Sequence, residues 1–223
     1  TLMAMGHKVT LLPAQYITPY VRRNKTDRND AMAIIEASRN KAIKPVPVKT
    51  EYQQSLQSLH RIREQWKQSR HARINSLRGM FREFGIVVPL GPSQAIKTTQ
   101  AALDELPALL QNAVMTILDE IATLQTRITE IEKQLKQTVK DDPVVQGFMA
   151  IQGIGLLTAT ALRASVQSPE QFKNGRQLSA WIGITPREYS SGEHRYLGRI
   201  SKRGDKHLRT LIIHGARSVM VRI

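Results

Sequence analysis

The sequence predicts a mainly α protein in three segments. Residues 1–48 form the C-terminal edge of an α/β domain, residues 49–142 a long helical hairpin or coiled coil, and residues 143–223 a separate C-terminal domain. Apolar residues recur at helical spacing through two long stretches of the middle segment. Pro45 and Pro47 forbid helix between the first and second segments, and Asp141-Asp142-Pro143 ends the second. A hydrophobic content of 41% is enough for a folded core.

The first segment alternates strand and helix signals. His7–Pro13 is predicted to be a short strand, followed by a short helix around residues 14–22 and a polar turn at residues 23–27. The next helix covers Asp27–Ser38, and residues 44–48 are an extended linker. The apolar positions that suit this helix are Ala31, Ile34, Ile35 and Ser38. This order is typical of the edge of an α/β domain.

The middle segment contains two long helices. Residues 51–85 form the first, residues 87–107 a loop with a short helix, and residues 107–140 the second, whose apolar residues alternate four and three apart. The pair predicts an antiparallel hairpin or a dimerising coiled coil. The first helix carries an excess of cations: Arg61, Arg63, Lys67, Arg70, Arg73, Arg78 and Arg82. This excess indicates a track for a phosphate backbone, with a solvated outer face as the alternative.

The composition favours a polyanionic partner. Thirty-three Lys and Arg against eighteen Asp and Glu leave a formal charge of +15, which is typical of nucleic-acid binding or of a basic surface without catalysis. The absence of cysteine excludes thiol nucleophiles and cysteine zinc sites and fits a reducing cytoplasm. Glycine, proline and glutamine interrupt the uncharged run at residues 143–162, so no membrane span is expected. The N-terminus has no signal-peptide layout and reads like the middle of a domain.

Two aspartates at a helix start are candidate metal ligands. Asp27 and Asp30 are three residues apart, so their carboxylates share one helix face and suit Mg²⁺. Two carboxylates are too few for a two-metal site, so further ligands must come from elsewhere. In the alternative interpretation Asp27 is the N-cap and Asp30 only favours the helix dipole.

A Gly-x-Gly turn is a candidate backbone-binding element. Gly153 and Gly155 lie between short helical stretches, where backbone N–H groups can approach a phosphate. The turn resembles the helix-hairpin-helix element, which grips nucleic acid without reading sequence. A tight helix–helix turn is the alternative.

Adjacent serines before a glycine are candidate nucleophiles. Ser190 and Ser191 precede Gly192 in a turn, where a hydroxyl can be exposed to a phosphate. The cations around them, which would stabilise charge, are Arg187, Arg195, Arg199, Lys202, Arg203, Lys206 and Arg209. The alternative is an ordinary turn in a phosphate-binding patch. His194, His207 and His214 show no triad or metal spacing, and His214 is expected at the core or its edge.

In series, these motifs resemble the insertion-sequence transposases with a RuvC-like DEDD domain, a family related to the Piv DNA invertase. Some members are described as bridge-RNA-guided recombinases. The resemblance covers essentially the whole chain. The matching stretches are residues 24–31, 153–155, 177–187, 190–192 and 199–204.

The resemblance implies DNA recombination through a serine nucleophile assisted by an acidic, Mg²⁺-binding cluster. Ser191 matches the nucleophile, and Asp27 and Asp30 match the third and fourth acidic residues. The first two acidic residues of the family lie on strands before the segment seen in this chain. The resemblance also implies DNA partners, a guide RNA held partly by the long helices, and active sites completed between protomers of a homodimer or homotetramer. A metal-dependent junction-resolving nuclease and a non-catalytic nucleic-acid adaptor are the two rival functions.

Overall fold

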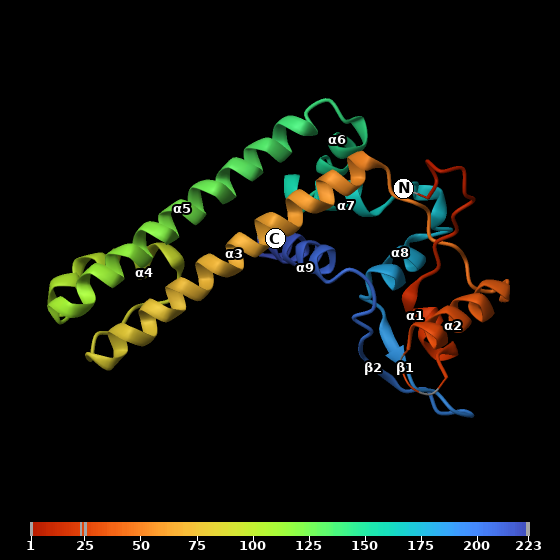
Figure 1. Cartoon of the computed structure of the whole chain (residues 1–223), viewed down its shortest axis with the longest axis horizontal. Helices are drawn as coiled ribbons and strands as arrows, with labels where there is room; N and C mark the ends of the chain where they lie inside the picture. The colour runs from red at the N-terminus through yellow and green to blue at the C-terminus, as the bar shows by residue number, and fades with distance from the viewer. Residues whose placement is uncertain (1, 23, 25, 222–223) are drawn as a thin grey trace. The chain divides into compact units, whose positions relative to one another are not determined.

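A computed structural model describes residues 2–22, 24 and 26–221 of the chain. Arg23 and Lys25, which belong to the predicted polar turn, lie outside the described residues. The chain divides into two compact units, Thr1–Thr50 and Glu51–Ile223, and each is described by itself (Figure 1). Among the described residues, no helix combines the length and apolar character needed to cross a bilayer.

The first unit contains two helices and a 3₁₀ turn. Helix α1 covers Ala14–Ile17, η1 covers Thr18–Tyr20 and α2 covers Asp27–Arg39, which confirms the predicted helices. The strand predicted at His7–Pro13 is wrong. An isolated bridge between Leu11 and Val46, with the Val46 N–H donating to the Leu11 carbonyl at 2.7 Å, is all that forms there. Pro45 and Pro47 flank Val46 and have no N–H group to donate, so the ladder cannot extend on that side.

The buried face of α2 is made of alanines. Ala33 and Ala37 are buried, whereas Ile34 and Ile35 are 49% and 45% exposed. Helix α2 contacts α1 and η1, and small side chains allow that close approach. The apolar spacing therefore identified a helix but not the side that it buries.

The second unit is organised on two long helices. Helix α3 covers Glu51–Glu83 and α5 covers Ala108–Thr138, joined through α4 (Pro92–Ala101) and η2 (Leu103–Glu105). Arg63 meets Glu132 while Arg73 meets Glu120, so the helices run antiparallel within one chain (Figure 1). In this structure the two helices pair with each other as a hairpin within one chain. The core at the end near α4 consists of Ile74, Leu77, Phe81, Ala95, Ala102, Leu106, Val114 and Ile121.

The rest of this unit packs around the other end of the hairpin. The elements are α6 (Pro143–Met149), α7 (Leu156–Ser165), η3 (Pro169–Gln171), α8 (Gly175–Ile182), β1 (Pro186–Glu188), β2 (Leu197–Ile200) and α9 (Lys206–Met220). Strands β1 and β2 pair antiparallel, with Pro186 opposite Ile200 and Glu188 opposite Leu197. Helix α7 packs against α3, and Leu56, Leu135 and Ala159 share one core. The short helices were predicted, but this small sheet was not.

Asp142 lies in the break between α5 and α6 and contacts the helices around it. Its carboxylate accepts the N–H groups of Val144 and Val145 at 3.0 and 3.3 Å and so caps α6. The Arg163 Nε donates to it at 2.9 Å and the Tyr52 hydroxyl at 3.3 Å. Burial alone would raise the pKa of Asp142, but these hydrogen bonds outweigh it and hold the pKa below its usual value. Asp142 therefore caps α6 and links it to α7 and α3.

Candidate functional site

The acidic pair lies at the start of α2. Thr26 is the N-cap, and its hydroxyl accepts the Asn29 N–H at 3.3 Å. The interpretation of Asp27 as the cap is therefore wrong, although both aspartates still favour the helix dipole. Asp27 is exposed and Asp30 is half-buried. Within the described part of this unit, neither carboxylate makes a side-chain hydrogen bond or ion pair, so both oxygens are available to a ligand.

This pair is suited to part of a metal site. Carboxylate oxygens are the ligands that hard divalent cations prefer. Over residues 2–22, 24 and 26–221, however, no three His, Cys, Asp or Glu side chains lie together so as to hold a metal ion. Asp27 and Asp30 would therefore be a partial ligand set, and the Mg²⁺ expectation stays a prediction.

The candidate nucleophiles lie at the end of the β1–β2 hairpin. The backbones of Ser191 and His194 exchange two hydrogen bonds of 3.2 Å across the turn. Gly192 in that turn has a φ of 57°, a left-handed conformation that favours glycine. Both Ser190 and Ser191 are exposed. The Ser-Ser-Gly sequence thus forms the tight turn that the sequence predicted.

The two serines differ in their contacts. The Ser190 hydroxyl donates to Glu188 Oε1 at 2.8 Å, and the Arg195 Nε donates to the same oxygen at 3.1 Å. The Ser190 hydrogen bond and then the Arg195 charge hold the pKa of Glu188 below its usual value. The Ser191 hydroxyl has no side-chain hydrogen bond to any described residue. The Ser190 hydroxyl is therefore hydrogen-bonded within the hairpin, whereas the Ser191 hydroxyl has no partner among the described residues and is accessible to a ligand.

Hydrogen bonds fix the backbone of the loop after β2, which carries several cationic side chains. Lys202 adopts a φ of 54°, and its N–H donates to the Gly183 carbonyl at 3.0 Å. Arg187 donates to the Ser201 carbonyl at 3.1 Å. Arg209 is buried and donates to the carbonyls of Ile182 and Arg203 at 2.9 and 3.3 Å. Arg209 therefore braces the loop from inside. The exposed cations here are Arg187, Arg195, Arg199, Lys202 and Arg203.

The Gly-x-Gly turn joins α6 to α7. Gly153 has a φ of 87°, and a Cβ there would lie 2.8 Å from Val219 Cγ2 and 2.9 Å from the Gly215 carbonyl oxygen. Gly155 is exposed and has open space around its α-carbon. The first glycine therefore serves close packing of the turn on α9, and the second leaves room for a ligand.

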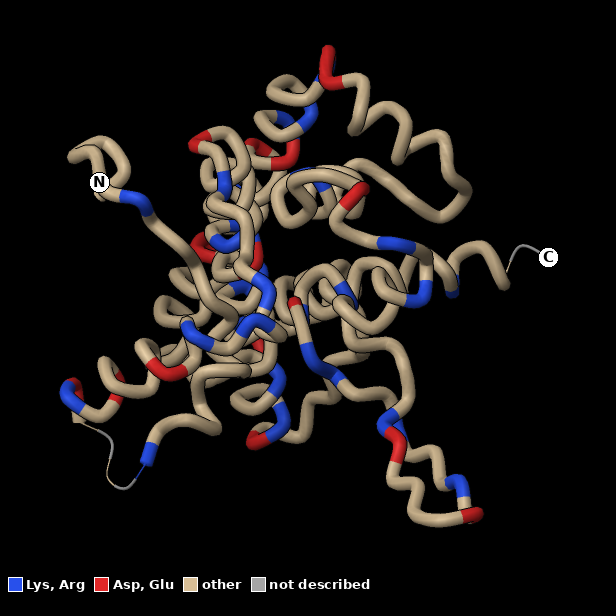
Figure 2. Tube along the Cα trace, turned by 90° about the vertical axis from the view of Figure 1, so that its right-hand side faces the viewer, with Lys and Arg blue, Asp and Glu red and all other residues tan. Residues whose placement is uncertain are grey.

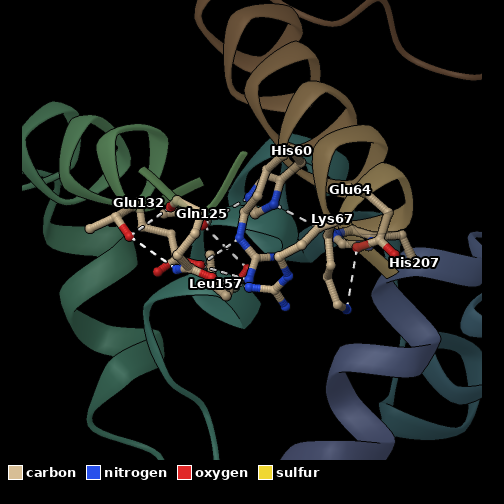
Figure 3. Close-up of polar contacts among 11 residues, drawn as sticks. His60, Glu64, Lys67, Gln125, Glu132, Leu157 and His207 are labelled. Carbon is tan, nitrogen blue, oxygen red and sulfur yellow. Dashed lines mark hydrogen bonds and ion pairs between the residues drawn. The ribbon is translucent and has the colours of Figure 1, made fainter. Parts of the chain in front are cut away.

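Many cationic side chains of α3 form ion pairs or hydrogen bonds within the second unit. Arg63 pairs with Glu132 at 2.7 Å, Arg70 donates to Gln125, and Arg73 pairs with Glu120. Arg78 donates to the Pro89 carbonyl at 3.0 Å, and Lys67 lies 3.6 Å from Glu64. Figure 2 marks the charged positions along the trace, and Figure 3 shows the contacts of Gln125 and Glu132. Several cations of α3 therefore already have partners within this unit, and the phosphate track on this helix stays a prediction. Arg61 and Arg82 are exposed and have no ion pair among the described residues.

Two histidines meet between α3 and α9, a contact that the sequence interpretation missed. His60 is buried, and its Nε2 lies 2.9 Å from the Thr160 Oγ1, while its Nδ1 lies 3.4 Å from the Nε2 of His207 (Figure 3). Burial, the neighbouring His207 and the Arg63 charge lower the pKa of His60 to about 4. Burial also lowers the pKa of His207. Both rings are therefore uncharged at neutral pH.

The histidine contact carried only a faint sequence signal. His60 follows Leu56 by one helical turn and so continues its buried stripe. Its partner is 147 residues away in sequence, and no spacing rule joins them. His214 is exposed, so the prediction of a core position for it is wrong.

Comparisons with known proteins place these features in one family. Residues 1–86 match the sequence model of a DEDD transposase domain of IS110 type, and residues 145–223 match that of the transposase IS116/IS110/IS902 family. Three relatives align with nearly the whole chain. A probable family 20 transposase of Pseudomonas aeruginosa is 41% identical over 98% of this chain and 66% of its own length. The transposase for insertion sequence element IS1111A of Coxiella burnetii is 38% identical over 99% of this chain and 62% of its own length.

The third relative is the transposase for insertion sequence element IS1328 of Yersinia enterocolitica, 36% identical over 98% of this chain and 66% of its own length. The chain thus spans slightly less than two thirds of the length of these relatives. The two matched stretches are residues 1–86, which include α3, and residues 145–223, which follow α5. Over these two stretches the chain therefore matches the IS110/IS116 family of transposases.

Proposed function

We propose that this chain is the DNA-processing part of a transposase that cuts and rejoins DNA through the hydroxyl of Ser191. One observation carries the choice of residue. The Ser191 hydroxyl is exposed and unbonded at the end of the hairpin, whereas Ser190 donates to Glu188. A nucleophile needs a free oxygen that a scissile phosphate can approach. The exposed cations of the hairpin and of the following loop would stabilise the charge that develops on that phosphate.

The proposed step exchanges one phosphodiester for another. The Ser191 hydroxyl loses its proton to water, and its Oγ forms a bond to phosphorus while the bond from phosphorus to one DNA oxygen breaks. That oxygen leaves as a hydroxyl after taking a proton from water. The phosphoserine link keeps the ester bond, so attack by another DNA hydroxyl reverses the chemistry and joins a new strand.

Asp27 and Asp30 would contribute carboxylates to a divalent cation, with Mg²⁺ as the expected ion. Their free oxygens on one face of α2 support this role. When bound, such an ion would stabilise charge on a phosphate oxygen. Since two carboxylates are a partial ligand set, we assign no step to the ion. The proposal also includes a guide RNA and a homodimer or homotetramer, as the family resemblance implies.

A metal-dependent nuclease is the second candidate. The match of residues 1–86 to a DEDD transposase domain favours it, since that name denotes a set of acidic residues. In this alternative water attacks the phosphate and Ser191 only lines the site. It predicts cleaved DNA without any protein–DNA link.

A trapping experiment separates the two candidates. The protein encoded by the whole reading frame is mixed with labelled DNA that carries the ends of its insertion sequence, with Mg²⁺ and any RNA that copurifies. The mixture is denatured and analysed by mass spectrometry. A DNA adduct on the peptide that contains Ser191 is the expected result.

Two matched variants complete the test. Ser191→Ala should abolish the adduct and strand exchange, whereas Ser190→Ala, which keeps the Glu188–Arg195 pair, should retain both. Loss of activity in Ser190→Ala alone would move the nucleophile by one residue. Cleavage without an adduct in the parent protein would establish the nuclease instead. Tight binding to DNA that stays intact would leave a non-catalytic adaptor.

A further inference from the structure

A groove lies between α3, α7 and the start of α9, in the second unit. Its volume is about 310 Å³, at the small end of the range for ligand pockets, which suits one nucleotide rather than a duplex. One stripe of α3 forms a wall, because residues 57, 61, 64, 65 and 68 recur at helical spacing. Ala161 and Ala164 of α7 and Asp205 and His207 near the start of α9 also line it.

The groove contains unused amide groups. Gln57, Gln65 and Gln68 line it, and none of these side chains hydrogen-bonds to another described residue. Each amide offers two N–H donors and a carbonyl acceptor in one plane. That combination matches the mixed donor and acceptor edge of a nucleobase, and glutamine pairs with adenine in this way.

The charges of the groove are unusual for this chain. Arg61 is its one lining Lys or Arg, against the carboxylates of Glu64 and Asp205. Glu64 lies 3.6 Å from Lys67, and Asp205 caps α9 by accepting the Leu208 N–H at 3.0 Å. Figure 3 shows Glu64 and Lys67 near His207, and both histidines are uncharged at neutral pH. In a protein with a formal charge of +15, this groove has no excess of positive charge, so it suits a neutral polar group such as a base and leaves Arg61 for a single phosphate.

The lining residues from α7 and α9 leave room for a flat ring. Ala161 and Ala164 are small, so a planar ligand can approach the backbone of α7. His207 contributes an aromatic ring, and unstacked bases bind next to such rings and to polar groups. Arg61 is exposed and has no ion pair with a described residue, so it can meet the phosphate attached to a bound base.

We propose that this groove binds a single unpaired nucleobase, with its phosphate at Arg61. The proposal rests on the proposed function, since it assumes that the protein handles nucleic acid. Bases of RNA and of single-stranded DNA offer the same edges and ring faces. The groove therefore defines the ligand chemistry, and the experiment identifies which strand supplies it.

Photocrosslinking tests the location directly. Stem-loops of RNA and of DNA, each with one 5-iodouracil at an unpaired position, are irradiated with the protein and the crosslinked peptides are sequenced by mass spectrometry. We expect crosslinks to peptides of residues 57–68 and to the peptide that contains His207. The RNA and DNA arms show which strand enters. Crosslinks found only elsewhere, for example on the β1–β2 hairpin, would overturn the proposal.

Paired variants test the chemistry. Gln65→Ala combined with Gln68→Ala removes two exposed groove amides, and Gln134→Ala combined with Gln137→Ala removes two exposed amides of α5 as the control. We expect the groove variant to bind the stem-loop with an unpaired base about tenfold more weakly, as the loss of two hydrogen bonds predicts. The same stem-loop with an abasic residue at that position should bind both variants equally.

The outcomes separate the groove from the proposed function. Equal affinities of the groove variant and the control for the stem-loop with the base would overturn the groove proposal alone, since nucleic-acid binding itself would persist. If the parent protein bound neither stem-loops nor duplex DNA, the proposed function would fail and the groove proposal with it.

Discussion

The Nδ1 of His60 lies 3.4 Å from the Nε2 of His207, so the long hairpin and α9 meet through two imidazole rings. A neutral pair can place one proton between these nitrogens, but two imidazolium rings would bring two N–H groups and two charges together. Thr160 occupies the other nitrogen of His60 at 2.9 Å. The contact therefore depends on the rings staying uncharged.

Acid should destabilise the protein through this pair. The pKa of His60 is lowered from 6.5 to about 4, so the unfolded chain takes up this proton before the folded protein does, and stability declines as the pH falls from 6.5 to about 4. A shift of this size corresponds to about 3 kcal/mol of unfolding free energy. Urea denaturation at a series of pH values measures it. His60→Gln should flatten the decline between pH 6.5 and 4, whereas the exposed His71→Gln should leave it unchanged.

Gly183 and Gly204 should not tolerate a side chain. Gly183 has a φ of 81°, and a Cβ there would overlap the Arg203 backbone; a Cβ at Gly204 would overlap the Trp181 carbonyl. Gly183→Ala should cost about 2–4 kcal/mol of unfolding free energy, from overlap and backbone strain together. Gly79→Ala, in open space on α3, should instead stabilise by up to about 1 kcal/mol. Thermal denaturation of both variants checks the contrast, and equal melting temperatures would contradict the overlap.

Alanine substitutions at the two glycines of the α6–α7 turn should affect different properties, the first the stability of the protein and the second its affinity for DNA. Gly153→Ala should lower the melting temperature, because its Cβ would strike Gly215 and Val219. Gly155→Ala has open space and should fold nearly as well as the parent. If the turn approaches a phosphate, Gly155→Ala will bind DNA more weakly in a fluorescence anisotropy titration. Unchanged affinity in this variant would leave the turn with a packing role only.

Arg61 and Arg63 should behave differently although they are near neighbours on α3. Arg61→Gln should leave the unfolding free energy nearly unchanged and, for a single-stranded ligand, reduce the slope of log affinity against log salt by about 0.7, the value for one phosphate contact. Arg63→Gln should lower the unfolding free energy by about 1 kcal/mol, because Arg63 pairs with Glu132. Salt titrations and urea denaturation of the two variants provide the comparison. A change of salt slope in Arg63→Gln alone would contradict the assignment.

Local sequence determined the helices and the breaks between them. Spacing alone predicted α3 over residues 51–85 and α5 over residues 107–140, because the apolar residues of a helix recur every three to four positions along the sequence. It also located the serine turn, since a glycine at position 192 supplies the left-handed conformation that the turn requires. The acidic pair at the start of α2 followed from the same local rules.

Only the tertiary structure decided what each side chain meets. It showed that Arg63, Arg70 and Arg73 contact side chains of α5, and that Ala33, not Ile34, is buried in α2. It brought His60 and His207 together and distinguished the occupied Ser190 from the free Ser191. Periodicity reports conformation along the chain, but the partner of a charged or small residue depends on packing between distant segments. That information is absent from any local pattern, so the sequence determined the elements and the fold determined their contacts.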